Sequence, residues 1–401
     1  MYLTPKEERI LAGEEGEVRQ KAMEIIVAIG EIYNADRLIP ISSAHISGTS
    51  YKTIGDAGIE WIESLTSTKF SVPTTVNPFG MDLALWEIMG IRKDFAEKQM
   101  RIVNAFLKLG ATLTCSCIPY LIGNIPKFGE HIAWAESSAV CYANSVLGAR
   151  TNREGGPSAL ASAIIGLTGN FGYHLNEMRN PTVRVKVEVD LNEESDFGAL
   201  GHYVGKRIGN GVPYFTGIKR ASNDELKSLS AALAASGGVA LYHIKDITPE
   251  SSIVKSDGLE EINFTKSELK DSYEELSTVK EGKVDIVCLG CPHSSIEEIK
   301  KVAEMIKGKK VAPNTKLWLF TSLPTKILAD RCGYSKVIEE AGGNIYCDCC
   351  MVIAPIEDLG FKVMAVNSAK AAVYVPTLSK MNVVFGNLKR CIEIAISGEA
   401  K

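Results

Sequence analysis

The stretch Val284-Asp-Ile-Val-Cys-Leu-Gly-Cys-Pro-His293 joins an apolar strand to a turn that contains a cysteine. A helix pattern follows at 294–307, and strands alternate with helices from there on, with strands expected at 316–320, 344–346 and 363–366. This alternation predicts a largely parallel sheet whose two faces are covered by helices. The sequence therefore predicts a multi-domain α/β protein built of α/β/α layers.

Two other segments hold cysteines in the same turn-like setting as Cys291. They are Cys115-Ser-Cys117-Ile-Pro-Tyr120, at the end of an expected strand at 111–115, and Cys347-Asp-Cys349-Cys350. Ligand sites of parallel sheets lie beyond the carboxyl ends of the strands, so we expect Cys117, Cys291 and Cys350 to meet, with Lys370 beside them. Three converging thiolates can hold an iron–sulfur cluster and leave one iron without a protein ligand. An open metal position is typical of catalysis.

Composition narrows the class of protein. The chain has 401 residues, 23% of them charged, and a net charge of -4. This balance argues against a nucleic-acid-binding protein, which normally carries a basic surface. The charged start, Met1 to Glu8, lacks the apolar core of a signal peptide, and no stretch reaches the ~18 apolar residues of a membrane span. We therefore expect a cytoplasmic protein without a membrane partner.

The chain has ten cysteines. Disulfides would need an oxidising compartment, whereas cytoplasmic thiols stay reduced, so metal binding or burial is the expected role. Four cysteines lie in apolar or helical patterns and are interpreted as small core residues: Cys141, Cys288, Cys332 and Cys391.

Patterns along the chain predict three regions, at 1–185, 186–280 and 281–401. The first begins with a capped helix at Thr4, where Pro5 and Glu7 complete the signal. Its other expected elements are a strand at 38–41, a polar loop at 42–55, helices at 57–65, 91–109 and 131–149, and strands at 69–72 and 111–115. A strand at 182–190 leads into the middle region, which is interpreted as an α/β unit or an insertion.

Two polar loops could bind an anion. Ser50-Tyr51-Lys52-Thr53 combines hydroxyls, backbone N–H groups and an ammonium, which suits phosphate or carboxylate. A solvated loop that caps its own backbone is the alternative. Asn152-Arg153-Glu154-Gly-Gly places a guanidinium beside glycines that permit close approach. A turn with a surface arginine is the alternative there.

Three further side chains could handle protons or charge. His131 and Glu136 flank the start of the helix expected at 131–149, and either could act as acid, base or orienting group. Glu136 could also be an ordinary helix-start acid. Lys370 could bind an anion or extend to solvent. Additional candidates for substrate contact are Asn77, Ser137 and Ser368.

Several common catalytic motifs are absent from the chain. No Gly-x-Gly-x-x-Gly follows the early strands, and neither His-Glu-x-x-His nor Gly-x-Ser-x-Gly occurs. These absences argue against NAD enzymes, zinc peptidases and serine hydrolases.

Seven stretches carry a resemblance that spans nearly the whole chain: Ser50–Gly58, Cys117–Leu121, Gly129–Ala139, Asn144–Ser158, Gly290–His293, Asp348–Val352 and Asn367–Ala371. Together they resemble aconitase X, a branch of the aconitase superfamily. The central block from Asn144 to Ser158 is very specific. The resemblance implies an aconitase-like α/β fold.

The resemblance also implies a cofactor and a set of site residues. The family pattern places the ligands of a cluster, expected to be 4Fe–4S with one iron not bound by protein, at Cys117, Cys291 and Cys350. We assign the binding of an anionic substrate to Ser50, Tyr51, Lys52, Thr53, Asn152 and Arg153. Proton handling is assigned to His131 and Glu136, with Lys370 as a further catalytic candidate.

Members of the family are hydro-lyases. Their known substrates include cis-3-hydroxy-L-proline and, in an archaeal branch, mevalonate 5-phosphate, which yields trans-anhydromevalonate 5-phosphate for isoprenoid biosynthesis. The resemblance implies an iron–sulfur hydro-lyase that acts on mevalonate 5-phosphate. Within the family the alternative is a hydroxyproline dehydratase. An alternative of another class is a non-catalytic iron–sulfur or zinc-binding scaffold subunit.

A partner is implied as well. Members of the superfamily have a small swivelling domain that closes the site, and this chain ends at Lys401, soon after Ser368-Ala-Lys370. We therefore expect the large subunit of a split enzyme, whose small subunit carries the swivel domain and could supply the general base.

Overall fold

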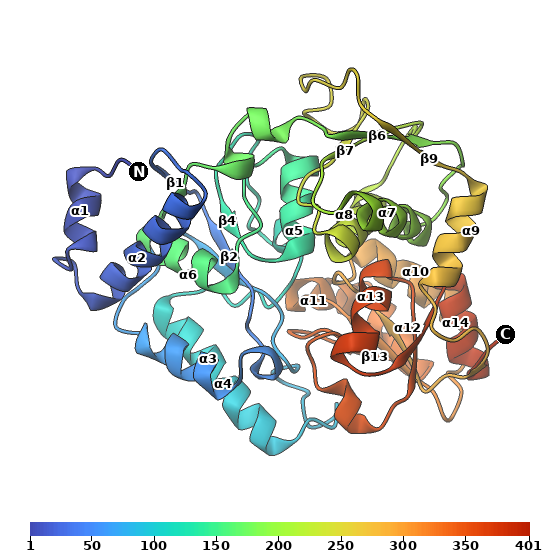
Figure 1. Ribbon diagram of the computed structural model, residues 1–401. Coiled ribbons are helices and arrows are strands. Elements are labelled where there is room, and N and C mark those ends of the chain that lie inside the picture. Colours follow the sequence, from blue (N-terminus) through green and yellow to red (C-terminus); the bar gives the residue numbers. More distant parts are fainter.

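The computed structural model describes residues 1–401 and contains three consecutive parallel sheets, each with its own helices (Figure 1). We call the parts that contain them the first, middle and last regions. The middle sheet begins at Val183, slightly before the boundary predicted at 185/186, and the last begins at Ile286. The predicted division at 280/281 falls between these sheets and stays a prediction.

The first region has a short central sheet of order β3-β2-β4, with all strands parallel. A separate antiparallel pair joins β1 to β5. The strands are β1 (Leu38–Pro40), β2 (Ala44–Ile46), β3 (Thr74–Val76), β4 (Ala133–Trp134) and β5 (Leu167–Gly169). The helices are α1 (Pro5–Leu11), α2 (Glu17–Ile32), α3 (Tyr51–Ser64), α4 (Lys93–Leu109), α5 (Ser137–Tyr142) and α6 (Gly156–Ile165).

Several elements expected in the first region are corrected by the structure. The capped start of α1 at Thr4 is confirmed. The helix predicted at 57–65 is the second part of α3, which is kinked at Gly55 (φ 60°, ψ -166°). A short helical segment that starts at Tyr51 precedes the kink, and the hydroxyl of Ser50 accepts the N–H of Lys52 and caps it. Residues 69–72 and 111–115 form no strand, and 131–149 is not one helix. That segment contains β4, α5 and a π-helical turn at Ala143–Leu147.

The many alanine and serine residues at 131–149 explain why one continuous helix is predicted there. A run of alanine and serine suits a helix, but Ala133 and Trp134 pair with β2 at the buried centre of the sheet. Glu136 then accepts the N–H of Ser138 and starts α5 as its N-cap. Tertiary pairing with β2 therefore decides the conformation that local propensity leaves open.

The middle region contains a parallel sheet of order β8-β7-β6-β9. Its strands are β6 (Val183–Val187), β7 (Pro213–Thr216), β8 (His243–Ile244) and β9 (Glu261–Phe264). Its helices are α7 (Glu194–Ile208), α8 (Asn223–Gly237) and α9 (Lys266–Glu275). α7 and α8 pack closely on each other between this sheet and the last region (Figure 1). The layer of two helices therefore couples the two regions.

The last region has a five-stranded parallel sheet of order β13-β12-β11-β14-β15. The predicted strands at 316–320, 344–346 and 363–366 are confirmed. The strands are β11 (Ile286–Leu289), β12 (Lys316–Phe320), β13 (Asn344–Tyr346), β14 (Val363–Val366) and β15 (Asn382–Phe385), and a separate pair joins β10 (Gly282–Lys283) to β16 (Glu399–Ala400). The helices are α10 (Ile296–Ile306), α11 (Leu323–Arg331), α12 (Tyr334–Glu340), α13 (Ala369–Leu378) and α14 (Leu388–Ser397).

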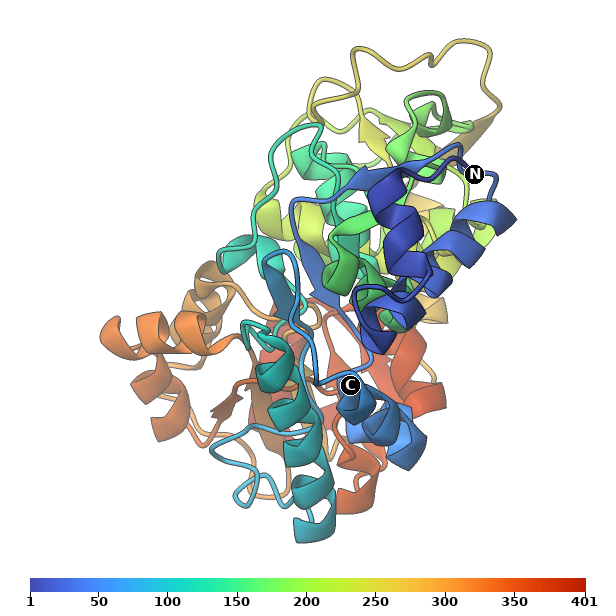
Figure 2. The ribbon, with the colours of Figure 1, turned by 90° about the vertical axis from the view of Figure 1, so that its left-hand side faces the viewer.

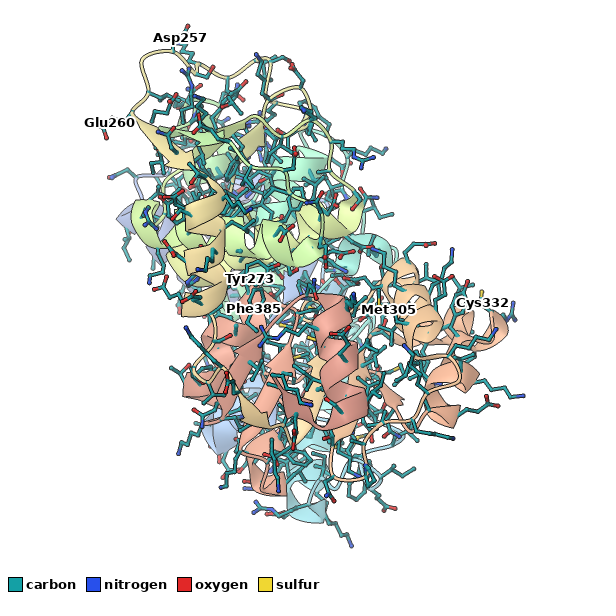
Figure 3. All side chains as sticks on the ribbon, turned by 90° about the vertical axis from the view of Figure 1, so that its right-hand side faces the viewer. Asp257, Glu260, Tyr273, Met305, Cys332 and Phe385 are labelled. Atoms are coloured by element: carbon teal, nitrogen blue, oxygen red, sulfur yellow. The ribbon has the colours of Figure 1, made fainter.

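The regions pack on one another through apolar side chains. α3 and α4 of the first region lie alongside the last region (Figure 2), and Met81, Met89 and Phe95 share a buried core cluster with its sheet. Where the middle and last regions meet, the ring centroids of Tyr273 and Phe385 lie 5.0 Å apart (Figure 3). Cys332 is exposed at the outer edge of the last region, away from this contact. No helix combines the length and the apolarity that a membrane crossing requires.

Candidate active site

A cavity of about 260 Å³ lies between the first and the last regions. Cys117, Cys291 and Cys350 all line it, although up to 233 positions of sequence separate them. The other polar side chains of its wall are Ser47, Asn77, Glu136, Ser137, Arg153, Lys370 and Tyr374. The structure therefore places the three cysteines and Lys370 around one cavity, as the sequence predicts.

Sheet topology brings these residues together. Cys291, Cys350 and Lys370 follow β11, β13 and β14, whose carboxyl ends lie at one edge of the last sheet. Cys117 arrives from the first region on a segment that runs beside β3 without forming a regular strand. In that segment the N–H of Ser116 donates to the carbonyl of Val76 at 3.1 Å.

Each of the three sulfur atoms accepts hydrogen bonds. Cys117 Sγ accepts the backbone N–H of His293 at 3.3 Å, and the hydroxyl of Ser368 bonds to Cys291. The sulfur of Cys350 accepts the backbone N–H groups of Val352 and Ile353. Donors of this kind stabilise thiolate and tune iron–sulfur centres.

The neighbouring cysteines have different surroundings. Cys115 hydrogen-bonds to the carboxylate of Asp348, and the thiol of Cys349 faces the sulfur of Met89 at 3.9 Å. Neither lines the cavity. All ten cysteines are free of disulfides, and Cys141, Cys288 and Cys391 are buried among apolar residues as predicted. The interpretation of Cys332 as a core residue is wrong, because Cys332 directly follows the end of α11 and is exposed.

The donor set fits an iron–sulfur cluster. No three histidine, cysteine, aspartate or glutamate side chains are arranged to hold a single metal ion. The irons of a cluster are bound by separate thiolates, so the sulfur atoms must face one cavity and need not converge on one point. Burial raises the pKa of all three thiols, to about 12 for Cys291, although the nearby charge of Lys370 opposes the rise. Loading with metal must therefore release protons.

A buried ion pair stands beside the thiols. The ammonium of Lys370 bonds to Glu136 Oε1 and donates to the hydroxyl of Ser138 at 3.2 Å. Both charged side chains are only 9% exposed. Behind the pair, the amide of Asn77 donates to Glu136 Oε2 at 2.7 Å, and His45 Nε2 contacts Asn77 Oδ1 at 3.1 Å. Because the amide oxygen can only accept, His45 carries its proton on Nε2.

These contacts fix the charges. Burial disfavours ionisation of Glu136, but the charge and hydrogen bond of Lys370 outweigh it and lower its pKa to about 2. Burial also opposes the charge of Lys370, but Glu136 dominates and raises its pKa. Burial lowers the pKa of His45 to about 4. At neutral pH the site therefore holds one ammonium, one carboxylate and one neutral imidazole.

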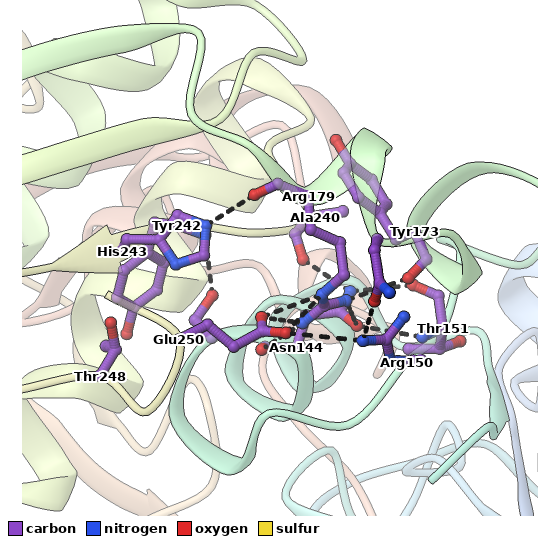
Figure 4. Close-up of polar contacts among 12 residues, drawn as sticks. Asn144, Arg150, Thr151, Tyr173, Arg179, Ala240, Tyr242, His243, Thr248 and Glu250 are labelled. Atoms are coloured by element: carbon purple, nitrogen blue, oxygen red, sulfur yellow. Dashed lines mark hydrogen bonds and ion pairs between the residues drawn. The ribbon is translucent and has the colours of Figure 1, made fainter. Parts of the chain in front are cut away.

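A buried network holds the loop that carries Arg153 (Figure 4). The guanidinium of Arg179 bonds to the carboxylate of Glu250 at 2.5–3.0 Å and donates to the carbonyl of Asn144 at 3.0 Å. The side chain of Asn144 in turn exchanges two hydrogen bonds with the backbone of Thr151, at 2.9 and 3.0 Å. Two residues further on, Arg153 is exposed at the rim of the cavity and donates to the carbonyl of Ala234 at 3.2 Å.

Other predicted site residues lie outside the cavity wall. Ser50 caps α3, Lys52 pairs with Glu357 at 2.7 Å, and Tyr51 accepts a hydrogen bond from Lys98 at 2.6 Å. Thr53 donates to the carbonyl of Ser50 at 2.8 Å. A role for these four residues in substrate binding stays a prediction.

Three more predicted residues also lie outside the wall. His131 Nδ1 faces His174 Nδ1 at 2.9 Å, and Asn152 holds the backbone of Phe171 and Tyr173. Ser368 touches the site through Cys291. The predicted roles of these three side chains stay predictions.

Sequence reasoning missed other residues. Tyr374 lines the cavity four positions after Lys370 on α13, a spacing that puts both on one helix face and could have revealed it. No local sequence pattern indicates a site role for Ser47, His45 or His293, because the residues that they contact are distant in sequence.

Comparisons with known proteins agree with this architecture. Family models of the aconitase X first, second and third domains match residues 1–177, 181–274 and 284–397. The chain superposes on the crystal structure of Thermococcus kodakaraensis aconitase X (holo-form) with a TM-score of 0.92 and 45% identity, covering 98% of this chain and 100% of that one.

Named relatives share most of the chain. The phosphomevalonate dehydratase large subunit of Methanocaldococcus jannaschii is 53% identical, with 98% of this chain and 100% of the relative covered. That of Methanosarcina mazei is 50% identical, with 100% and 98% covered. The cis-3-hydroxy-L-proline dehydratase of Pseudomonas aeruginosa is 32% identical, and the match covers 98% of this chain but 70% of that protein. Three successive domain matches, and a fold shared from end to end, place the chain in the aconitase X family.

Proposed function

We propose that this chain, together with a small subunit, dehydrates mevalonate 5-phosphate to trans-anhydromevalonate 5-phosphate. The observation that carries the proposal is one cavity lined by three hydrogen-bonded thiols and a buried lysine–glutamate pair. The choice of substrate is supported by relatives named phosphomevalonate dehydratase large subunit, which are 50–53% identical over nearly the whole chain.

The reaction removes a tertiary hydroxyl from one carbon and a proton from its neighbour, which lies alpha to the carboxylate. A base takes the proton from carbon, and the electron pair of the broken C–H bond forms the double bond. The departing hydroxyl takes up one proton and leaves as water, so that no net proton is gained or lost. A 4Fe–4S cluster held by Cys117, Cys291 and Cys350, with one iron not bound by protein, would supply a Lewis acid for the departing hydroxyl.

The buried pair supplies fixed charge. The ammonium of Lys370 is held by Glu136 and faces the thiols, so it attracts the carboxylate or the departing oxygen of the substrate. Glu136 is a poor proton acceptor, because its pKa is near 2. We therefore assign the general base to the small subunit.

Arg153 is the residue that we assign to the phosphate of the substrate. It is exposed at the rim of the cavity, where a group remote from the reacting carbons would lie. Its guanidinium donates one hydrogen bond to the carbonyl of Ala234 and has further N–H donors for a phosphate. Asn77 and Ser137 line the inner wall and can contact the carboxylate end.

Replacing Arg153 by glutamine should raise KM for mevalonate 5-phosphate by about 10- to 100-fold, the value of one charge-assisted contact, and leave kcat nearly unchanged. Steady-state kinetics would measure this split. Arg207→Gln is the control, since Arg207 stacks on Tyr203 on the surface of α7. An unchanged KM in Arg153→Gln would remove this residue from the phosphate site.

The substrate is tested by comparing three compounds on one preparation of the chain with its small subunit. These are mevalonate 5-phosphate, mevalonate and cis-3-hydroxy-L-proline. We expect turnover of mevalonate 5-phosphate, a much higher KM for mevalonate, and no turnover of cis-3-hydroxy-L-proline. Consumption of hydroxyproline alone would assign the chain to the other known activity of the family.

A further inference from the structure

His293 lies two residues after Cys291 and is completely buried. Its imidazole contacts both of the other cysteine-bearing segments. Nε2 lies 2.8 Å from the carbonyl of Cys349, and Nδ1 lies 3.0 Å from the hydroxyl of Ser116. One side chain therefore touches the residue before Cys117 and the residue before Cys350.

The chemistry of the partners fixes the proton on the ring. A carbonyl oxygen only accepts, so Nε2 carries the proton and donates to Cys349. Nδ1 is then an acceptor, and the hydroxyl of Ser116 donates to it. Both ring nitrogens are satisfied, and the neutral ring needs no charged partner in this buried place.

The backbone of His293 adds two more contacts. Its N–H donates to Cys117 Sγ at 3.3 Å, and its carbonyl accepts from the ammonium of Lys227 at 3.2 Å. Lys227 belongs to α8 of the middle region and is itself paired with Asp224 and Glu298. All three regions therefore meet at this residue.

We propose that His293 is a positioning residue that holds the three cysteine-bearing segments at the spacing that cluster binding requires. The proposal rests on the proposed function only in that the three thiols hold a cluster. His293 does not line the cavity described above, so we expect it to act through the segments it joins.

The test compares three variants with the wild-type complex of the chain and its small subunit. His293→Phe keeps a ring but loses both side-chain hydrogen bonds. His293→Gln can keep the donor to Cys349, and His293→Asn can keep the acceptor for Ser116. His243→Gln is the control, because His243 on β8 of the middle region is equally buried, and its Nε2 bonds to the carbonyl of Arg179 and to no cysteine-bearing segment.

The first readout needs no cluster. After removal of iron, the rates at which N-ethylmaleimide alkylates Cys117, Cys291 and Cys350 are mapped by mass spectrometry. We expect rates about tenfold higher in His293→Phe, because a lost buried hydrogen bond eases local opening. His293→Gln and His293→Asn should lie between it and the wild type, and His243→Gln should match the wild type.

The second readout is iron and sulfide per chain after reconstitution, which should fall in the same order. The proposal would be overturned if His293→Gln and His293→Asn kept the alkylation rates and the iron content of the wild type. The same holds for His293→Phe if that variant folds. A wild-type complex that takes up no iron would instead count against the proposed function, while the alkylation rates would still decide the role of His293.

Discussion

Replacing Cys291 by serine should abolish iron–sulfur loading and reduce dehydratase activity on the order of 10³-fold or more, since Lewis-acid assistance is worth several kcal/mol. Cys291 lines the cavity with Cys117 and Cys350, and a serine hydroxyl is a poor iron ligand. Iron and sulfide analysis, the visible spectrum and the rate of turnover would be measured on the same anaerobic preparation.

Cys115→Ser is the matched control for this experiment. Cys115 lies two residues before Cys117, but it bonds to Asp348 and does not face the cavity. A serine there can still donate to the carboxylate, so iron content and activity should stay near those of the wild type. Full loading of Cys291→Ser, or loss of the cluster in Cys115→Ser, would reverse the assignment of ligands.

Replacing Lys370 by methionine should lower kcat/KM by about 10²- to 10³-fold, the effect of removing one fixed charge donor from an active site. The same change leaves the carboxylate of Glu136 buried without its partner, which should cost about 3–5 kcal/mol of folding stability. Kinetics at matched iron content and a denaturant midpoint would separate the two effects.

The double variant Glu136→Gln/Lys370→Met distinguishes catalysis from stability. It removes both charges, so most of the lost stability should return. Activity should stay low, because the ammonium that faces the thiols is still missing. Recovery of wild-type kcat/KM in the double variant would show that Lys370 matters only for folding.

The part of the fold that the sequence could predict is the last region. Its strands are mostly apolar, and Cys291, Cys350 and Lys370 each come within a few residues of the end of one of them. The rule that ligand sites lie beyond the carboxyl ends of parallel strands was therefore enough to predict one site. The family resemblance and the aconitase-like fold are confirmed by the comparisons.

The first region was harder to predict because its elements are short. β4 has two residues and depends on pairing with β2, which no local pattern of small residues reveals. The loop expected at 42–55 contains β2 and the start of α3. Lys52 illustrates the same difficulty for the site, since its carboxylate partner Glu357 lies 305 positions away.

The polar contacts behind the cavity also escaped prediction. His45, Asn77 and Glu136 come from three different segments, and only the sheet β3-β2-β4 aligns them. A buried histidine has no sequence signature of its own, since core and catalytic histidines look alike without their partners. Glu136 and Lys370 were predicted singly, but their ion pair spans 234 positions and became visible only in the fold.

The most direct test of the central claim is the reaction itself. The chain is purified anaerobically with its small subunit, mevalonate 5-phosphate is added, and the mixture is followed by mass spectrometry and proton NMR. We predict loss of one water and the appearance of a vinylic proton, in the wild type and not in Cys291→Ser. An iron-loaded wild-type complex that leaves mevalonate 5-phosphate unchanged would contradict the account.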